Sequence, residues 1–263
     1  MSKGFALVTG ASSGIGKAYA ESLAARGYNL IIVARREDRL QELAGVLRDK
    51  YKRQVIVHPA DLANHDDLLG LEKLLRERED VEILVNNAGL GAVGPLASVS
   101  PDKLENLVKV NIIALTRLCQ AALPGFLARD RGTIVNIGSV IAIYPSSGAA
   151  GYSGSKAYVI NFTRSLQAEL AKTNVVVQVI MPGPVLSEFF GDRLPPFPAE
   201  LFMSTEQLAE AGLAALDQRE LICFPTLYEP QLWTAFDDAR RALMKAASLT
   251  GTPAPRFGLA ERK

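Results

Sequence analysis

Two side chains spaced one helical turn apart point to acid–base chemistry. Tyr152 and Lys156 are four residues apart at the start of a segment with a helical pattern, so the phenol and the ammonium group lie on one face. A free tyrosine has a pKa of about 10, and a fixed positive charge nearby stabilises the phenolate and lowers that pKa towards the working range. The pair therefore predicts a proton donor and acceptor. A packed tyrosine beside a surface lysine is the alternative.

A small hydroxyl residue precedes this pair along the chain. The apolar run 132–138 predicts a buried strand, and Ser139 follows it at the carboxyl edge, where ligands bind in open parallel sheets. The segment between Ser139 and Tyr152 is long enough for a loop to return both hydroxyls to one cleft. Without Tyr152 and Lys156, Ser139 would be read as an ordinary turn former.

A glycine-rich turn between the first expected strand and the first expected helix predicts phosphate binding. The sequence TGASSGIG at 9–16 places glycines at Gly10, Gly14 and Gly16. These glycines permit a tight turn and close approach of a pyrophosphate, and the helix that follows offers unpaired N–H groups at its N-terminus. The alternative is a glycine-rich turn that binds nothing.

The end of the second expected strand carries two basic residues. Dinucleotide-binding folds usually have a carboxylate here, about 20 residues after the glycine-rich turn, for the adenosine ribose. This chain instead has Arg35 and Arg36. A guanidinium pairs well with a 2′-phosphate, which favours NADP(H) over NAD(H). The two arginines could also belong to the solvated start of the next helix, but a cation there opposes the helix dipole.

Seven short apolar runs alternate with longer amphipathic segments, a pattern typical of parallel strands covered on both faces and joined by crossover helices. The pattern predicts a single-domain α/β Rossmann fold with a doubly wound, seven-stranded parallel sheet and helices on both faces. The domain would span 1–249, with a long loop at 184–203 and a C-terminal helix at 229–247, and 250–263 would be an irregular tail. The expected strands are 5–9, 28–34, 54–58, 81–86, 132–138, 175–181 and 221–224, and the other expected helices are 14–27, 36–49, 64–78, 101–129, 152–173 and 205–217.

Composition excludes several classes of function. The 263 residues carry a formal net charge of +1, which provides no field for holding a nucleic acid. Two distant cysteines, Cys119 and Cys223, predict buried free thiols in a reducing compartment, and the two histidines form no cluster suited to a metal. With neither a signal-peptide core nor a long uninterrupted apolar run, we expect a cytosolic protein with no membrane anchor.

Taken in order, these motifs resemble the short-chain dehydrogenase/reductase family, and the resemblance covers nearly the whole chain. Further family motifs follow the third, fourth and sixth expected strands, and one lies in the helix between the fourth and fifth. They are Asp61-Leu62, Asn86-Asn87-Ala88-Gly89, Pro182-Gly183 and, in that helix, Asn111.

The resemblance implies a role for each candidate catalytic residue. Tyr152 would be the general acid in reduction and the base in alcohol oxidation, and Ser139 would hydrogen-bond the same substrate oxygen. Lys156 would lower the pKa of Tyr152 and hold the nicotinamide ribose. Asn111 would keep a helix kink and a water that relays protons to solvent.

The resemblance also implies an extended cofactor surface. Asp61 would contact the adenine amine with Leu62 beside it, and the segment 182–187 would contact the carboxamide. Ser187 stands where the family often has threonine, so the hydroxyl is kept. The full predicted set is Gly10, Ser12, Ser13, Gly14, Ile15, Gly16, Arg35, Arg36, Asp61, Leu62, Asn87, Ala88, Gly89, Tyr152, Lys156, Pro182, Gly183, Val185 and Ser187.

Apolar side chains dominate the expected substrate walls at 90–96, 140–149 and 184–203, and Ile141, Tyr144, Phe189 and Phe190 are the candidate contacts. No cluster of arginines there would clamp an acidic substrate. We therefore expect a reductase of an apolar carbonyl compound such as a ketone or aldehyde, and fatty-acyl and steroid-like groups would fit these walls as well. We also expect the loop 184–203 to act as a lid, the alternatives being a rigid surface loop or a subunit contact.

Two other functions stay open. An NAD-linked alcohol dehydrogenase would share the fold and the catalytic residues. A non-catalytic scaffold that senses the dinucleotide would need none of the proton chemistry, so the intact catalytic residues argue against it. Because members of the family commonly form dimers and tetramers, we expect a homodimer or homotetramer.

Overall fold

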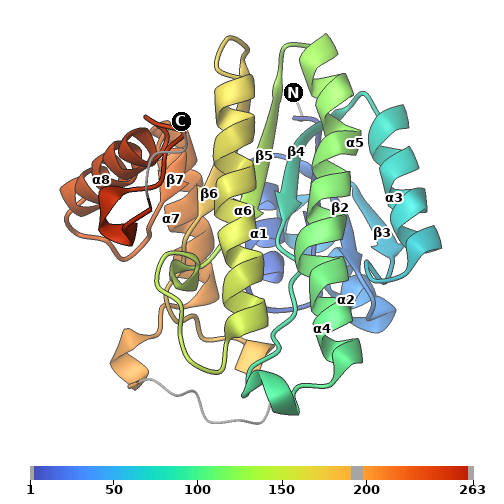
Figure 1. Cartoon of the computed structure of the whole chain (residues 1–263). Coiled ribbons are helices and arrows are strands. Elements are labelled where there is room, and N and C mark those ends of the chain that lie inside the picture. The colour runs from blue at the N-terminus through green and yellow to red at the C-terminus, as the bar shows by residue number, and fades with distance from the viewer. Residues whose placement is uncertain (1–2, 191–197, 260–263) are drawn as a thin grey trace. The chain divides into compact units, whose positions relative to one another are not determined.

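The described residues of the computed structural model, 3–190 and 198–259, form one seven-stranded parallel sheet with strand order β3-β2-β1-β4-β5-β6-β7 (Figure 1). The order reverses between β1 and β4, and such a switch point opens a crevice at the carboxyl ends of the strands. The strands are β1 (Phe5–Thr9), β2 (Asn29–Ala34), β3 (Val55–Pro59), β4 (Val81–Asn86), β5 (Gly132–Ile137), β6 (Val175–Ile180) and β7 (Ile222–Cys223).

The central strands are buried on both faces, which explains their nearly continuous apolar sequence. In β1, Ala6 and Val8 join the core cluster under α1, whereas Leu7 points to the other face. All three side chains are fully buried. The predicted strands and their limits agree with the structure to within two residues, and Cys119 and Cys223 are buried free thiols as predicted.

Helices cover both faces of this sheet. Figure 1 shows α3, the α4–α5 helix and α6 in front of it and α1 and α2 behind, with α7 against α1. The bounds are α1 (Gly14–Ala25), α2 (Glu37–Tyr51), α3 (His65–Glu77), α4 (Pro101–Val108), α5 (Leu115–Ala128), α6 (Ala150–Glu169) and α7 (Thr205–Asp217).

One long helix departs from regular α geometry. Between α4 and α5 the residues Lys109–Ala114 form a π-helical turn, and the three pieces make one continuous helix. Among the described residues, this helix, Pro101–Ala128, is the one whose length and hydropathy would suffice to cross a membrane. Half of its most apolar window is buried, and α5 packs against α3, β4 and β5.

The loop that follows β6 has a closed base. Val185 and Met203 form a parallel bridge, with Leu186 N donating to Met203 O at 3.0 Å and Met203 N donating to Pro184 O at 3.1 Å. Short 3-10 helices, Glu188–Phe190 and Ala199–Leu201, lie beyond the bridge. The predicted lid at 184–203 lies partly outside the described residues, and its role stays a prediction.

Contacts divide the chain into two compact units, Met1–Pro225 and Thr226–Lys263. The first holds the sheet and α1 to α7. The second contains α8 (Gln231–Ala247) and a 3-10 turn at Pro255–Phe257 within the expected irregular tail. The boundary thus precedes the C-terminal helix, which the sequence analysis groups with the sheet.

Candidate active site

The glycine-rich turn after β1 forms a cradle that only glycine permits. Gly10 and Gly14 have φ values of +67° and +56°. A Cβ at Gly16 would lie 2.3 Å from the Gly10 carbonyl oxygen, and one at Gly10 would lie 2.8 Å from Asn87 Nδ2. Ser13, the N-cap of α1, makes no side-chain cap bond, and the first turn carries no acidic residue. The turn therefore fits an anionic pyrophosphate.

Thr9 fastens this turn to the end of β4, a role that the sequence analysis missed. Its hydroxyl donates to Val85 O at 3.2 Å and accepts from the backbone N–H groups of Asn87 and Ala88 at 3.0 Å each. Asn87 Nδ2 donates back to Thr9 O at 2.9 Å. The predicted residues Gly10, Asn87 and Ala88 are therefore brought together.

The two predicted arginines point to different places. Arg36 donates to the hydroxyls of Ser12 and Ser13, with its shortest bond, Nη2 to Ser13 Oγ, at 2.7 Å. Arg35 instead lies 3.9 Å from Asp61 Oδ2. Arg36 therefore joins the glycine-rich turn, and Arg35 joins the predicted adenine-binding residues.

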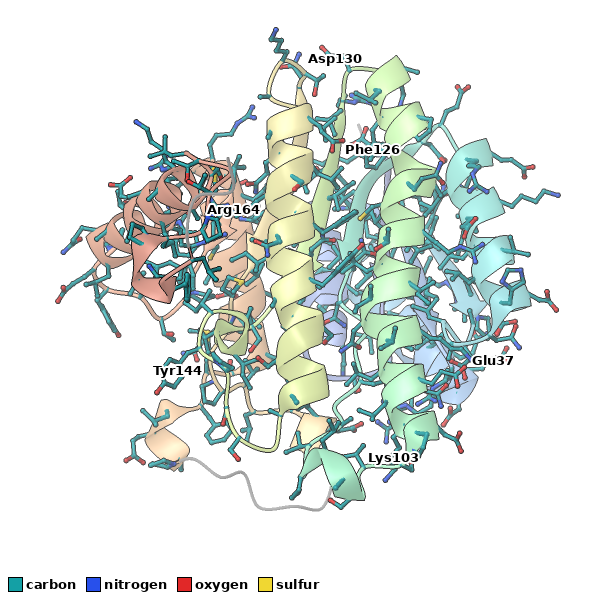
Figure 2. The ribbon with its side chains drawn as sticks, in the orientation of Figure 1. Glu37, Lys103, Phe126, Asp130, Tyr144 and Arg164 are labelled. Carbon is teal, nitrogen blue, oxygen red and sulfur yellow. The ribbon has the colours of Figure 1, made fainter. Side chains whose placement is uncertain are left out.

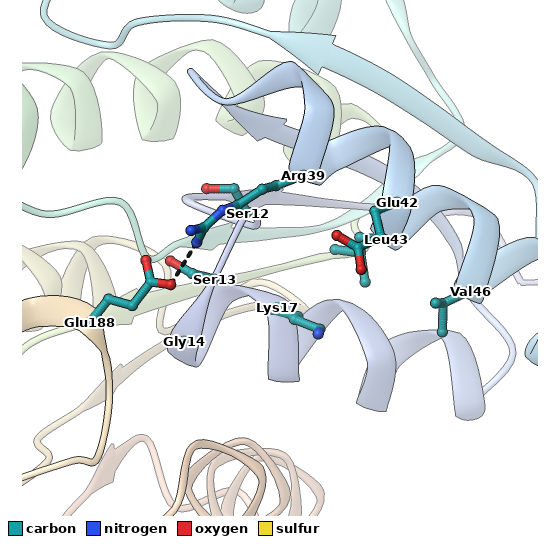
Figure 3. A pocket seen from close by; sticks show the side chains of 9 residues that line it. All are labelled: Ser12, Ser13, Gly14, Lys17, Arg39, Glu42, Leu43, Val46 and Glu188. Carbon is teal, nitrogen blue, oxygen red and sulfur yellow. Dashed lines mark hydrogen bonds and ion pairs between the residues drawn. The ribbon is translucent and has the colours of Figure 1, made fainter.

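A cavity of about 280 Å³ opens beside the glycine-rich turn, between α1 and α2 (Figure 3). Arg39, which the sequence analysis missed, lines the cavity from α2, and Glu188 faces Arg39 from the loop after β6. The lining holds none of the predicted catalytic residues, so it belongs to the cofactor end of the site. Its residues are Ser12, Ser13, Gly14, Lys17, Arg39, Glu42, Leu43, Val46 and Glu188.

The predicted catalytic residues converge at the carboxyl end of β5. Ser139 lies two residues after the end of β5, and its hydroxyl is near enough to Tyr152 on α6 to lower the pKa of the phenol. Lys156, 6% exposed, lies one turn along α6, and its Nζ is 5.7 Å from the centre of the Tyr152 ring. The ammonium donates to the Ile137 carbonyl oxygen at 2.7 Å, which fixes it at the end of β5.

Burial sets the pKa values of this pair. It raises the pKa of Tyr152 to about 12, and the nearby Ser139 hydroxyl offsets only part of that rise. Burial also lowers the pKa of Lys156 to about 8. The expected lowering of the Tyr152 pKa by Lys156 is not found in the protein alone, where the pKa follows from desolvation of the phenol and, to a lesser extent, from Ser139. Tyr152 is thus protonated at neutral pH.

Asn111 lies in the π-helical turn and joins three parts of the site. Its side chain pairs reciprocally with the Leu90 backbone, Nδ2 donating to Leu90 O at 3.0 Å and Leu90 N donating to Oδ1 at 2.8 Å. Nδ2 also donates to Ser155 Oγ at 3.0 Å, and Ser155 Oγ donates to Tyr152 O at 2.7 Å. The predicted kink is therefore a π-helical turn, and it connects the 89–90 loop to α6.

Replacing Asn111 by alanine is expected to lower the free energy of unfolding by about 2–4 kcal/mol. The substitution leaves the Leu90 N–H and C=O without their side-chain partner, and an unsatisfied buried polar group costs about 1–3 kcal/mol. Urea denaturation measures the change. Asn106→Ala, at an exposed position on α4, is the matched control. Equal stability of the two variants would contradict the bridging role.

The segment after β6 reaches both halves of the site. Pro182 O accepts a hydrogen bond from Val140 N at 3.0 Å, next to Ser139. Ser187 approaches the glycine-rich turn, because a Cβ at Gly14 would lie 3.3 Å from the Ser187 Cβ. This placement brings the predicted carboxamide segment to the cofactor cradle.

The predicted substrate residues do not all gather at Tyr152. The Phe189 ring packs against the Tyr152 ring with 5.2 Å between centroids, and a Cβ at Gly91 would lie 2.9 Å from Phe189 Cζ. Ile141 is half-buried, and its carbonyl accepts from Ser153 Oγ at 2.9 Å. Tyr144 is 82% exposed, at the same end of the sheet as Lys103 and opposite Asp130 (Figure 2). The side chain of Phe190 lies outside the described part.

The sequence matches the family model for short chain dehydrogenases over residues 4–195. The chain belongs to the short-chain dehydrogenase/reductase family, in agreement with the sheet order, the glycine cradle and the Ser139, Tyr152 and Lys156 cluster described above.

Two solved structures resemble nearly the whole chain. A short-chain dehydrogenase from Sphingobium yanoikuyae in complex with NADPH has a TM-score of 0.90 and 38% identity, covering 95% of this chain and 98% of that one. A bulky-bulky ketone specific alcohol dehydrogenase from Comamonas testosteroni has a TM-score of 0.89 and 36% identity, covering 98% of this chain and 99% of that one.

Curated relatives differ in their described activity. The inactive hydroxysteroid dehydrogenase-like protein 1 of Homo sapiens is 40% identical over 181 residues, which cover 68% of this chain and 54% of that protein. The very-long-chain 3-oxoacyl-CoA reductase of Anas platyrhynchos is 32% identical over 225 residues, covering 84% of this chain and 72% of that protein. The chain thus matches about half the length of the first relative.

Proposed function

We propose that this chain is an NADP(H)-dependent reductase of bulky, apolar ketones or aldehydes, with Tyr152 as its proton donor. The observation that carries the proposal is the meeting of Ser139, Tyr152 and Lys156 at the same sheet edge as the glycine-rich turn. A dinucleotide held by that turn would reach a substrate held at Tyr152.

NADP(H) is the cofactor that the site fits best. The Gly10, Gly14 and Gly16 cradle would take the pyrophosphate and Arg36 the 2′-phosphate, while Lys156 and the 182–187 segment would hold the nicotinamide half. The NADPH in the Sphingobium yanoikuyae neighbour supports this choice. When bound, the cofactor supplies the hydride for carbonyl reduction.

The residues of this chain would manage the proton. Tyr152 holds its proton at neutral pH and would give it to the carbonyl oxygen, which the Ser139 hydroxyl would also bind. With a pKa of about 8, Lys156 keeps its charge near neutral pH and would stabilise the phenolate left behind. Asn111 would hold α6 and the 89–90 loop in register with this pair.

The proposed substrate class follows from apolar surroundings. Phe189 lies against Tyr152, and the Comamonas testosteroni neighbour is described as specific for ketones with two bulky groups. A carbonyl flanked by two large apolar groups is the substrate we propose. The inactive human relative favours a second candidate, a non-catalytic protein that senses the dinucleotide.

Oxidation of NADPH by the purified chain tests the two candidates directly. A panel of ketones and aldehydes graded by the size of both carbonyl substituents should give turnover that is highest with the bulky members. NADPH binding without turnover on any member of the panel would favour the sensing protein instead. A light-scattering mass measurement on the same preparation checks the predicted homo-oligomer, and the cytosolic location stays a prediction.

Replacing Arg36 by alanine is expected to weaken NADPH binding by about 10- to 100-fold and to leave NADH binding nearly unchanged. The substitution removes a charge-assisted hydrogen bond to the 2′-phosphate, worth about 1.5–3 kcal/mol. Equilibrium titration of both cofactors measures the ratio, with Lys172→Ala at an exposed site as control. A parallel Arg35→Ala variant should change the ratio less, since Arg35 faces Asp61. Equal loss for both cofactors would contradict the assignment.

A further inference from the structure

A single carboxylate connects the loop after β6 to two arginines, Arg36 at the N-cap of α2 and Arg39 within α2. Glu188 Oε2 lies 2.9 Å from Arg36 Nη1, and Glu188 Oε1 lies 2.6 Å from Arg39 Nη1. Figure 3 shows Glu188 paired with Arg39 among the residues that line the cavity beside the glycine-rich turn. Each oxygen of the carboxylate thus serves one guanidinium.

The two arginines are arranged as an anion site. Ser12 and Ser13 orient the Arg36 guanidinium against the glycine-rich turn, and Arg39 lies one helical turn further along α2. Two planar guanidinium groups beside two serine hydroxyls match the donor pattern that a phosphate prefers. The same arginines hold the pKa of Glu188 down to about 2, so its carboxylate is charged at every physiological pH.

We propose that Glu188 competes with the 2′-phosphate of NADP(H) for Arg36 and Arg39, and that this competition sets how strongly the site prefers NADP(H) to NAD(H). A phosphate monoester carries a charge of about −1.5 to −2 and needs the donors that Glu188 now occupies. NAD(H) has a hydroxyl at that position and leaves Glu188 paired. This inference rests on the proposed function only in requiring that the site bind a nicotinamide dinucleotide.

The strength of the competition follows from exposure. The side chains of Arg36 and Arg39 are each 41% exposed, and that of Glu188 is 55% exposed. Exposed ion pairs are screened by water and are individually weak. Two such pairs would reduce NADPH affinity by about 3- to 30-fold, without a matching effect on NADH.

Equilibrium binding tests the proposal without any turnover. The probes are NADPH and NADH, together with the fragments 2′,5′-ADP and 5′-AMP, which differ only in the 2′-phosphate. Glu188→Gln keeps the side-chain volume and removes the charge. It should tighten binding of NADPH and 2′,5′-ADP by about 3- to 30-fold and leave NADH and 5′-AMP unchanged.

A matched control separates local competition from a general change of charge. Glu200 is exposed in the Ala199–Leu201 segment of the same loop, so Glu200→Gln should leave all four affinities unchanged. Unchanged or weaker NADPH binding in Glu188→Gln would overturn the proposal. An equal gain for NADPH and NADH would overturn it as well, because such a gain reports opening of the loop rather than release of the phosphate donors.

Arg39 provides an independent arm of the experiment. In the Glu188→Gln background, Arg39→Gln should weaken NADPH binding and leave NADH binding unaffected. An unchanged NADPH affinity would show that Arg39 does not donate to the phosphate and would overturn the proposal. If no variant, nor the parent protein, binds NADPH, the proposed function itself fails. If all of them bind NADPH equally, only the competition is refuted.

Discussion

Replacing Tyr152 by phenylalanine is expected to reduce ketone reduction by about two to four orders of magnitude, the usual contribution of a positioned general acid. The phenylalanine keeps the ring that packs against Phe189 and removes only the hydroxyl near Ser139. NADPH binding should therefore persist while turnover is lost. The measurement is steady-state NADPH oxidation with a bulky ketone, paired with equilibrium titration of the cofactor.

Tyr158→Phe is the control for this substitution. Tyr158 lies on the same helix, stacks on Phe162 and shares a hydrogen bond with Thr116. Removing the Tyr158 hydroxyl tests whether the loss of any phenol on α6 lowers the rate of NADPH oxidation. A Tyr152→Phe variant that keeps more than about a tenth of the parent rate would refute the assigned role.

The raised pKa of Tyr152 makes the two reaction directions depend differently on pH. A phenol with a pKa of about 12 stays protonated through the neutral range, so reduction should not be limited by its donor there. Oxidation of the alcohol requires the phenolate, and its rate should rise as pH increases from about 6 to about 8. Initial rates in both directions, on one preparation, provide the comparison.

Replacing Gly16 by alanine is expected to abolish measurable dinucleotide binding and to lower the free energy of unfolding by about 1–3 kcal/mol. The new Cβ would lie 2.3 Å from the Gly10 carbonyl oxygen and 2.5 Å from Asn87 Nδ2. Because the Gly10 oxygen is backbone, it moves only if the whole cradle moves. Cofactor titration and urea denaturation measure the two effects.

A second glycine gives the opposite expectation. Gly70 is exposed in α3, and a Cβ there would meet nothing within 4 Å. Gly70→Ala should stabilise the fold by about 0.5–1 kcal/mol, because alanine loses less conformational freedom in a helix. If Gly16→Ala stabilised the fold as Gly70→Ala should and still bound the dinucleotide, the proposed role of the close backbone approach at Gly16 would be wrong.

The sequence predicts the sheet well because most of its strands are predominantly apolar and buried. Runs such as 29–34 and 81–86 are bounded by glycines and polar residues, so their limits can be read directly. The π-helical turn at Lys109–Ala114 could not be predicted in the same way. It accompanies the bonds between Asn111 and the Leu90 backbone, a contact that depends on the tertiary fold.

Motifs predict the candidate cofactor and catalytic residues, whereas the energetics of these residues depend on packing. The pKa of Tyr152 is governed by its burial, which spacing from Lys156 does not reveal. Arg39 has a signal in its position three residues after Arg36, but its partner Glu188 lies 149 residues further along the chain. Only the folded loop brings that pair together.

The switch point between β1 and β4 separates the candidate cofactor-selecting residues from the candidate catalytic residues. Arg36 and Arg39 belong to the side of the sheet that follows β2, and Tyr152 and Lys156 to the side that follows β5. In the described part of the chain, Glu188 bonds to Arg36 and Arg39, and Phe189 packs against Tyr152, so the Ser187–Phe189 segment links the two sides. Substitutions on the two sides that avoid this segment should have additive effects. Coenzyme preference and substrate range can therefore be re-engineered, or evolve, independently wherever that short segment is left intact.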